Sequence, residues 1–91
     1  MRLRWTDEAQ EDLRRVHDSL AEKNLGAAAR AVDSLLIAPL RLLEHPYAGS
    51  KVESMQEQGV RRILVGSYEI RYDIVGDFVR ILRLFHMREE R

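Results

Sequence analysis

Three apolar runs in the C-terminal part of the chain, joined by glycine-containing dipeptides, constrain the fold most strongly. The runs are VRRILV at 60–65, YEIRYDIV at 68–75 and FVRILRLFH at 78–86, and the links are Gly66-Ser67 and Gly76-Asp77. Two-residue links of this kind favour type I′ or II′ turns, which connect neighbouring antiparallel strands. The pattern therefore predicts a three-stranded antiparallel meander over residues 60–86.

The middle run alternates strictly between two kinds of side chain. The apolar row consists of Tyr68, Ile70, Tyr72 and Ile74, and the charged row of Glu69, Arg71 and Asp73. Because successive side chains of a strand point to opposite faces, we expect the first row to pack beneath helices and the second to lie on the other face. The last run is apolar at both parities, which is typical of a central strand covered on both faces.

Residues 1–59 predict one strand, two helices and a long loop. The segment RLRW at 2–5 alternates as a short strand does, and apolar residues then recur at helical spacing over residues 9–20 and 28–42. Pro39 lies inside the second pattern, so we expect one long helix that is kinked near residues 35–37. The aperiodic residues 45–59 predict the loop. The fold class is α+β, with an N-terminal strand and a two-helix hairpin packed on a small antiparallel sheet closed by the C-terminal meander.

Length and composition exclude several classes of protein. The 91 residues predict a single domain over 1–91. The absence of cysteine excludes disulfides and fits a reducing cytoplasm. No secretory signal is recognisable at the start, and no apolar run approaches the ~20 residues of a membrane span, so we expect a cytoplasmic protein without a membrane partner. Fifteen basic and fifteen acidic residues balance, and no direct binding to nucleic acid is predicted.

Familiar catalytic and metal-binding motifs are not found in the sequence. The three histidines, His17, His45 and His86, lie too far apart for paired ligand spacing, and no glycine-rich phosphate loop occurs. We therefore predict no metal and no cofactor. The remaining candidates are the basic and aromatic residues of the meander and its C-terminal end. From the pattern alone, simple cross-strand charge pairing on a solvated sheet, which needs no function, is the favoured interpretation of these residues.

Four stretches of the chain together have a recognisable order and spacing. They are WTDEAQEDL at 5–13, EHPYAG at 44–49, GVRRILVGSYEIRYDI at 59–74 and ILRLFHMREER at 81–91. In these stretches the chain resembles the RelE/ParE superfamily, the toxins of bacterial type II toxin–antitoxin modules. The resemblance covers nearly the whole chain and implies a helical hairpin on a small antiparallel sheet.

The superfamily implies two different activities. RelE-like members cut mRNA in the ribosomal A site with basic residues and a C-terminal tyrosine, whereas ParE-like members inhibit DNA gyrase. Where the RelE-like pattern has cations, this chain has Glu69 and Val60, and no tyrosine follows Arg88 in residues 89–91. The resemblance therefore predicts a ParE-like gyrase inhibitor rather than an enzyme. The alternatives are a RelE-like endoribonuclease and a non-toxic co-repressor subunit that binds only an antitoxin.

The resemblance also implies partners and contact residues. The partner is a cognate ParD-like antitoxin, with a DNA-binding N-terminal part and a flexible C-terminal segment that wraps the toxin. The predicted target-binding residues, which are the catalytic candidates in the endoribonuclease alternative, are Arg61, Arg62, Arg71, His86 and Arg88. The predicted antitoxin-binding residues are Leu13, Val16, Leu20, Val32, Leu36 and Tyr68. Whether Tyr68 and Tyr72 are core or contact residues stays open at this point.

Overall fold

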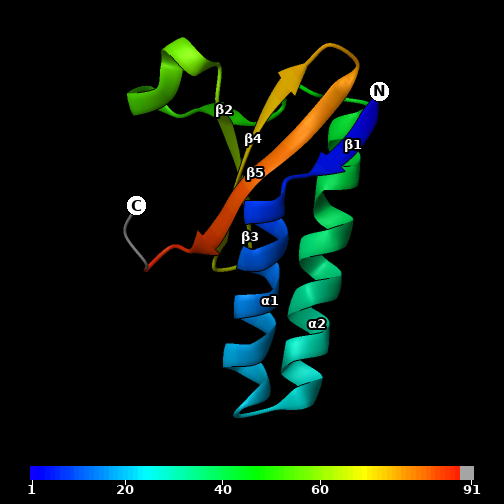
Figure 1. Cartoon of the computed structure of the whole chain (residues 1–91), viewed down its shortest axis with the longest axis vertical. Coiled ribbons are helices and arrows are strands. Elements are labelled where there is room, and N and C mark those ends of the chain that lie inside the picture. The colour runs from blue at the N-terminus through cyan, green and yellow to red at the C-terminus, as the bar shows by residue number, and fades with distance from the viewer. Residues whose placement is uncertain (89–91) are drawn as a thin grey trace.

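The computed structural model of the chain describes residues 1–88, without the side chains of residues 56 and 57. Two helices lie side by side against one face of a five-stranded sheet with the order β1-β5-β4-β3-β2 (Figure 1). This arrangement confirms the predicted α+β class with a helical hairpin packed on a small sheet. The N-terminal strand and the last strand, which are far apart in the sequence, are direct neighbours in the sheet.

The C-terminal meander forms as predicted. Its strands are β3 (Arg61–Val65), β4 (Tyr68–Val75) and β5 (Phe78–His86), and both pairings are antiparallel. The two turn glycines adopt φ angles of 59° and 58°, whereas Ser67 and Asp77 have negative φ, which fits a type II′ turn with glycine at its first central position. One detail differs from the expectation. The first strand, β1 (Arg2–Trp5), runs parallel to β5, so the sheet is mixed rather than wholly antiparallel.

The helical hairpin consists of α1 (Asp7–Ala21) and α2 (Leu25–Ile37). Side chains cap both N-termini, since the oxygens of Thr6 and Asn24 accept hydrogen bonds from backbone N–H groups in the first turns of α1 and α2. The predicted long kinked helix proves to be α2 followed by a 3₁₀ helix, η1 (Ala38–Leu43). The change occurs at Pro39 because proline has no N–H to continue the α-helical ladder.

The predicted loop over residues 45–59 contains short regular elements. Strand β2 (Ser50–Lys51) pairs with the beginning of β3, and the 3₁₀ helix η2 (Glu53–Gln58) follows it. Neither element has enough residues to produce a periodic pattern, so sequence periodicity does not predict them. Among residues 1–88, no helix is both long enough and apolar enough to cross a membrane.

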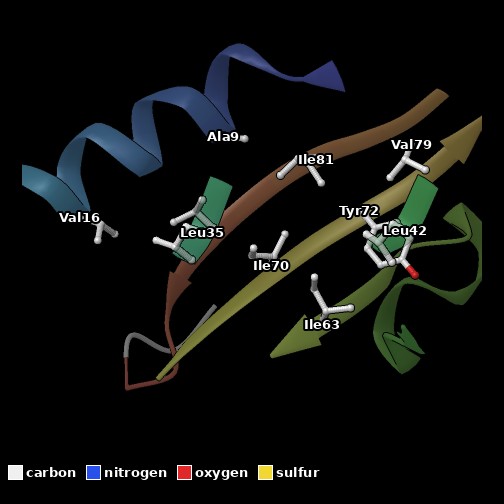
Figure 2. Close-up of a cluster of buried hydrophobic side chains, with 10 residues drawn as sticks. Ala9, Val16, Leu35, Leu42, Ile63, Ile70, Tyr72, Val79 and Ile81 are labelled. Carbon is white, nitrogen blue, oxygen red and sulfur yellow. The ribbon is translucent and has the colours of Figure 1, made fainter. Parts of the chain in front are cut away.

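The hydrophobic core lies between the hairpin and the sheet (Figure 2). Ile70 and Tyr72 of β4 are fully buried there, together with Leu35 of α2 and Leu42 of η1. The Tyr72 hydroxyl donates a hydrogen bond to the Pro46 carbonyl (2.8 Å) and accepts one from the Gly49 N–H (2.9 Å). Tyr72 is therefore a core residue, and its polar tip holds the loop after η1 against the sheet.

The outer edge of β5 is shared between β1 and the start of α1. Strand β1 pairs with β5 only as far as Ile81, and the next residue, Leu82, is an extra residue that produces a bulge opposite β4. Thr6, the residue after β1, extends the contact with β5, because its N–H and its hydroxyl both donate to the Ile81 carbonyl at 3.0 Å. The bulge thus brings the N-terminal half of α1 against β5.

Candidate functional site

The face of the sheet opposite the helices carries the charged row of β4, and we call it the outer face. Glu69 on this face is only 5% exposed. Its carboxylate accepts hydrogen bonds from Arg62 Nη1 at 3.2 Å and from Arg71 Nε at 2.8 Å. Two guanidinium groups from adjacent strands therefore compensate a buried carboxylate on the outer face.

A second carboxylate on the outer face is paired in the same way. Asp73 accepts two parallel hydrogen bonds from Arg80 on the neighbouring strand, with N–O distances of 2.9 Å and 2.6 Å. These hydrogen bonds raise the pKa of Arg80 above its usual value. Bidentate geometry of this kind gives the strongest ion pairs between arginine and a carboxylate.

A third buried carboxylate joins α1 to the bulge of β5. Asp12 is 2% exposed, and it accepts hydrogen bonds from Arg83 Nε (2.7 Å) and from the Leu84 N–H (3.0 Å). Arg83 Nη2 and Arg15 Nη1 donate two more, at 3.1 Å and 2.9 Å. Burial raises the pKa of Asp12, but these hydrogen bonds outweigh burial and hold the pKa below its ordinary value.

The Arg71 guanidinium has further neighbours on the outer face. It lies 5.0 Å from the centre of the Phe85 ring, within the range of a cation–π contact, and its Nη1 is 3.7 Å from Met55 Sδ. Arg71, Phe85 and Met55 help to line a small pocket of about 190 Å³. Arg71 is thus held by a carboxylate, a ring and a thioether at once.

This arrangement limits the chemistry of the outer face. Cleavage of a phosphodiester requires cations that stabilise added negative charge and an acid that protonates the leaving oxygen. On the outer face the positive charges of Arg62 and Arg71 already compensate Glu69, and Arg80 compensates Asp73. These ion pairs support the interpretation of the charged row as cross-strand charge pairing. The paired carboxylates are buried, however, so this face of the sheet is less solvated than that interpretation predicts.

The five predicted target-binding residues lie at three separate places. Arg62 and Arg71 meet at Glu69 on the outer face. Arg61 instead turns to the loop after η1, where it donates to the Gly49 carbonyl at 2.8 Å and stacks over the Tyr47 ring. His86 and the exposed Arg88 lie at the C-terminal end of β5, where the Arg88 N–H donates to His86 Nδ1 at 3.1 Å. They do not form one catalytic cluster.

A pocket of about 360 Å³ opens between α1 and the ends of β4 and β5, and we call it the α1 pocket. Its lining residues are Arg15, Val16, Ser19, Leu20, Tyr68 and His86. The rings of Tyr68 and His86 meet edge to face with their centres 5.3 Å apart. The pocket therefore combines apolar walls with a rim of hydrogen-bonding groups, which suits an apolar side chain of a binding partner.

The predicted antitoxin-binding residues divide between the two helices. Val16, Leu20 and Tyr68 line the α1 pocket. Leu13 packs half-buried against the core, Val32 is also half-buried, and Leu36 on α2 is exposed. Only the first three residues therefore share one site, and the assignment as antitoxin contacts stays a prediction.

Sequence reasoning missed Arg15, Ser19 and Asp12 as members of these clusters. The sequence did contain a signal for Asp12, because it shares one helical face with Ala9 and Val16, which are both buried. A carboxylate on an apolar face needs a buried partner. Identifying Arg83 as that partner requires knowledge of how the helix meets the sheet. Among the side chains that the structure describes, which exclude those of residues 56 and 57 and everything after residue 88, no three acidic or histidine groups lie together as a metal site requires.

Comparisons with known proteins agree with this fold. The profile of a family described as "ParE toxin of type II toxin-antitoxin system, parDE" matches residues 3–91. Among solved structures, "Chromosomal ParDE TA system from P. aeruginosa" includes a similar chain, with 26% sequence identity and a TM-score of 0.76. The similarity covers 94% of this chain and 95% of that one. A search of curated proteins found no match. The chain belongs to the ParE toxin family of type II toxin–antitoxin systems.

Proposed function

We propose that this toxin inhibits DNA gyrase by a protein–protein contact and is neutralised by a cognate antitoxin. Membership of the ParE family supports a toxin of this class. The observation that carries the proposal against mRNA cleavage is the burial of Glu69 between Arg62 and Arg71. A carboxylate occupies the place where a ribonuclease of this fold needs free positive charge.

The energetic argument follows from the burial of Glu69. A scissile phosphate brought to Arg62 and Arg71 has to compete with a carboxylate whose oxygens are already 3.2 Å and 2.8 Å from them. Displacing these arginines leaves Glu69 as an uncompensated buried charge, which costs about 3–5 kcal/mol. The outer face therefore suits recognition of another protein better than phosphodiester chemistry.

The test is a supercoiling assay with purified gyrase and relaxed plasmid. We expect the toxin to inhibit supercoiling at micromolar concentration. Arg88→Ala is expected to weaken inhibition without changing thermal unfolding, because Arg88 is exposed at the end of β5. Arg2→Ala is the matched control, since Arg2 is an exposed arginine on a different strand. Specific cuts in ribosome-bound mRNA, together with unimpaired gyrase, would reject the proposal.

The proposed antitoxin contact is centred on the α1 pocket. Its apolar walls come from Val16, Leu20 and Tyr68, and the rim offers Arg15 and Ser19 as hydrogen-bonding groups. A flexible C-terminal segment of the antitoxin fits such a site, because a segment that orders on binding can cover a large surface. The N-terminal part of the antitoxin binds operator DNA in this proposal, and the toxin itself makes no contact with DNA.

Substitution at the rim tests this contact without disturbing the core. Ser19 is exposed on α1, so Ser19→Arg places a long charged side chain over the pocket while the buried residues stay unchanged. We expect it to weaken co-purification with the antitoxin encoded beside the toxin and to reduce growth rescue by that antitoxin. Ser54→Arg is the matched control, since Ser54 is an exposed serine of η2. Equal co-purification of both variants would place the antitoxin elsewhere.

A further inference from the structure

Helix α2 is unusually apolar for a helix with one face uncovered. Among its 13 residues the only charged ones are Arg30 and Asp33. Ala28 and Leu35 face the core, yet the opposite face is open, with Ile37 63% exposed. Exposed apolar side chains that lie close together on a surface mark contact sites for other molecules. The outward face of α2 is therefore a candidate contact surface.

Four residues form the centre line of this outward face, which we call the α2 ridge. They are Gly26, Arg30, Asp33 and Ile37, and all four are exposed. Their spacing of four, three and four residues keeps them on one side of the helix. Leu36 and Leu40 flank the ridge and are exposed as well. The ridge thus has a small residue at one end, a large one at the other, and opposite charges between them.

This order is self-complementary. When a second copy is placed antiparallel on the ridge, with the two-fold axis between residues 31 and 32, Ile37 of each copy faces Gly26 of the other. The same register sets Arg30 of each copy opposite Asp33 of the other. Glycine lets two helices approach closely, and a large apolar side chain opposite it fills the space. A contact that uses the same patch on both chains is the isologous interface of a two-fold dimer.

The charges on the ridge are available for such a contact. With the described side chains of the single chain, which leave out residues 56, 57 and 89–91, neither Arg30 nor Asp33 forms an ion pair. The Arg30 guanidinium lies over Gly26, where a Cβ would be 3.2 Å from its Nη1. Arg30 has a flexible side chain, so turning it toward Asp33 of a second copy both pairs the charge and uncovers the glycine.

We propose that the α2 ridge is a homodimer interface, with two copies of the toxin packed antiparallel through α2. This proposal does not depend on the target of the toxin. A 13-residue helix is about 20 Å long. One helix pair of this length falls in the class of interfaces below about 1,200 Å², which are weak and reversible. We therefore expect a monomer–dimer equilibrium in the micromolar range.

Sedimentation equilibrium of the purified full-length chain tests the proposal, and charge exchange tests the register. Arg30→Asp and Asp33→Arg, each alone, set like charges against each other across the two-fold axis, so each is expected to raise the dissociation constant about tenfold or more. The double variant that carries both changes restores opposite charges, and its dissociation constant is expected to return close to that of the wild type. Circular dichroism confirms that each variant is folded.

A second set of variants tests the apolar part of the contact. Ile37→Glu is expected to abolish dimerisation, and Leu64→Glu is the matched control, since Leu64 on β3 is a similarly exposed apolar residue. A monomer at all concentrations up to several hundred micromolar overturns the proposal. A dimer that the double charge exchange does not restore also overturns it. If the α2 ridge is buried only after the antitoxin is added, the homodimer proposal is overturned as well.

Discussion

Replacement of Asp12 is the most informative perturbation of this fold. Asp12→Ala leaves the buried Leu84 N–H without its acceptor, which costs about 1–3 kcal/mol. The side chains of Arg83 and Arg15 are 44% and 43% exposed, so they return to water, and their lost ion pairs add only about 0–1 kcal/mol each. We therefore expect Asp12→Ala to lower the free energy of unfolding by about 1–5 kcal/mol.

Stability is measured by urea denaturation. When the dependence of the unfolding free energy on urea concentration is the same in all variants, the midpoint reports the change in stability. Asp12→Asn keeps an oxygen for the Leu84 N–H but loses the charge, and its loss is expected to be about half as large. Asp18→Asn is the matched control, because Asp18 lies on the same helix with a 68% exposed side chain, and we expect it to unfold as the wild type does. If Asp12→Ala stays within about 0.5 kcal/mol of the control, the carboxylate does not anchor α1 to β5.

The same carboxylate predicts a pH dependence. The pKa of Asp12 in the folded protein lies below the value of 3.8 that it has when unperturbed. The stabilisation is therefore fully present above that value and is lost as the pH falls through the folded pKa. The stability difference between the wild type and Asp12→Asn is expected to be constant near neutral pH and to shrink in acid. A difference that grows in acid would contradict the assigned direction of the shift.

Four further substitutions have defined outcomes. Gly49→Ala is expected to destabilise the protein by more than 1 kcal/mol in urea denaturation, because the added Cβ would lie 2.6 Å from the Tyr72 hydroxyl, and an unchanged midpoint would contradict this packing. Leu35→Ala is expected to lower the free energy of unfolding by about 2–5 kcal/mol, and Leu13→Ala to lower it clearly less, since only Leu35 is fully buried. Equal losses in the two variants would show that burial does not decide the loss of stability. Arg88→Ala is expected to change thermal unfolding by less than about 0.5 kcal/mol, and a larger loss would remove Arg88 from the target-binding set.

The elements with a strong period were predictable from the sequence. The meander followed from two glycine dipeptides, and the alternation of β4 correctly separated its core row from its charged row. Both signals are local, because turn type and side-chain parity depend only on neighbouring residues. The core face of α2 and η1 followed in the same way, since Ala28, Leu35 and Leu42 are buried as the spacing indicates.

The site was less predictable, because its contacts join residues that are distant in the sequence. Asp12 and Arg83 are separated by 71 positions, and nothing in either local pattern names the other. The sequence did not predict the direction of β1 relative to β5, because a four-residue strand does not indicate whether its partner runs parallel or antiparallel. The α1 pocket depends on the packing of the helix against the strand ends, and helical spacing alone does not describe that packing.

The pairing of β1 with β5 has a consequence for biosynthesis. Residue 2 leaves the ribosome well before residues 77 and 78, which are its neighbours in the sheet. At a synthesis rate of about 5–20 residues per second, several seconds pass in which the helical hairpin has no completed sheet to pack on. A polypeptide whose synthesis stops before β5 lacks the central pairing of the sheet permanently, so it cannot complete this fold.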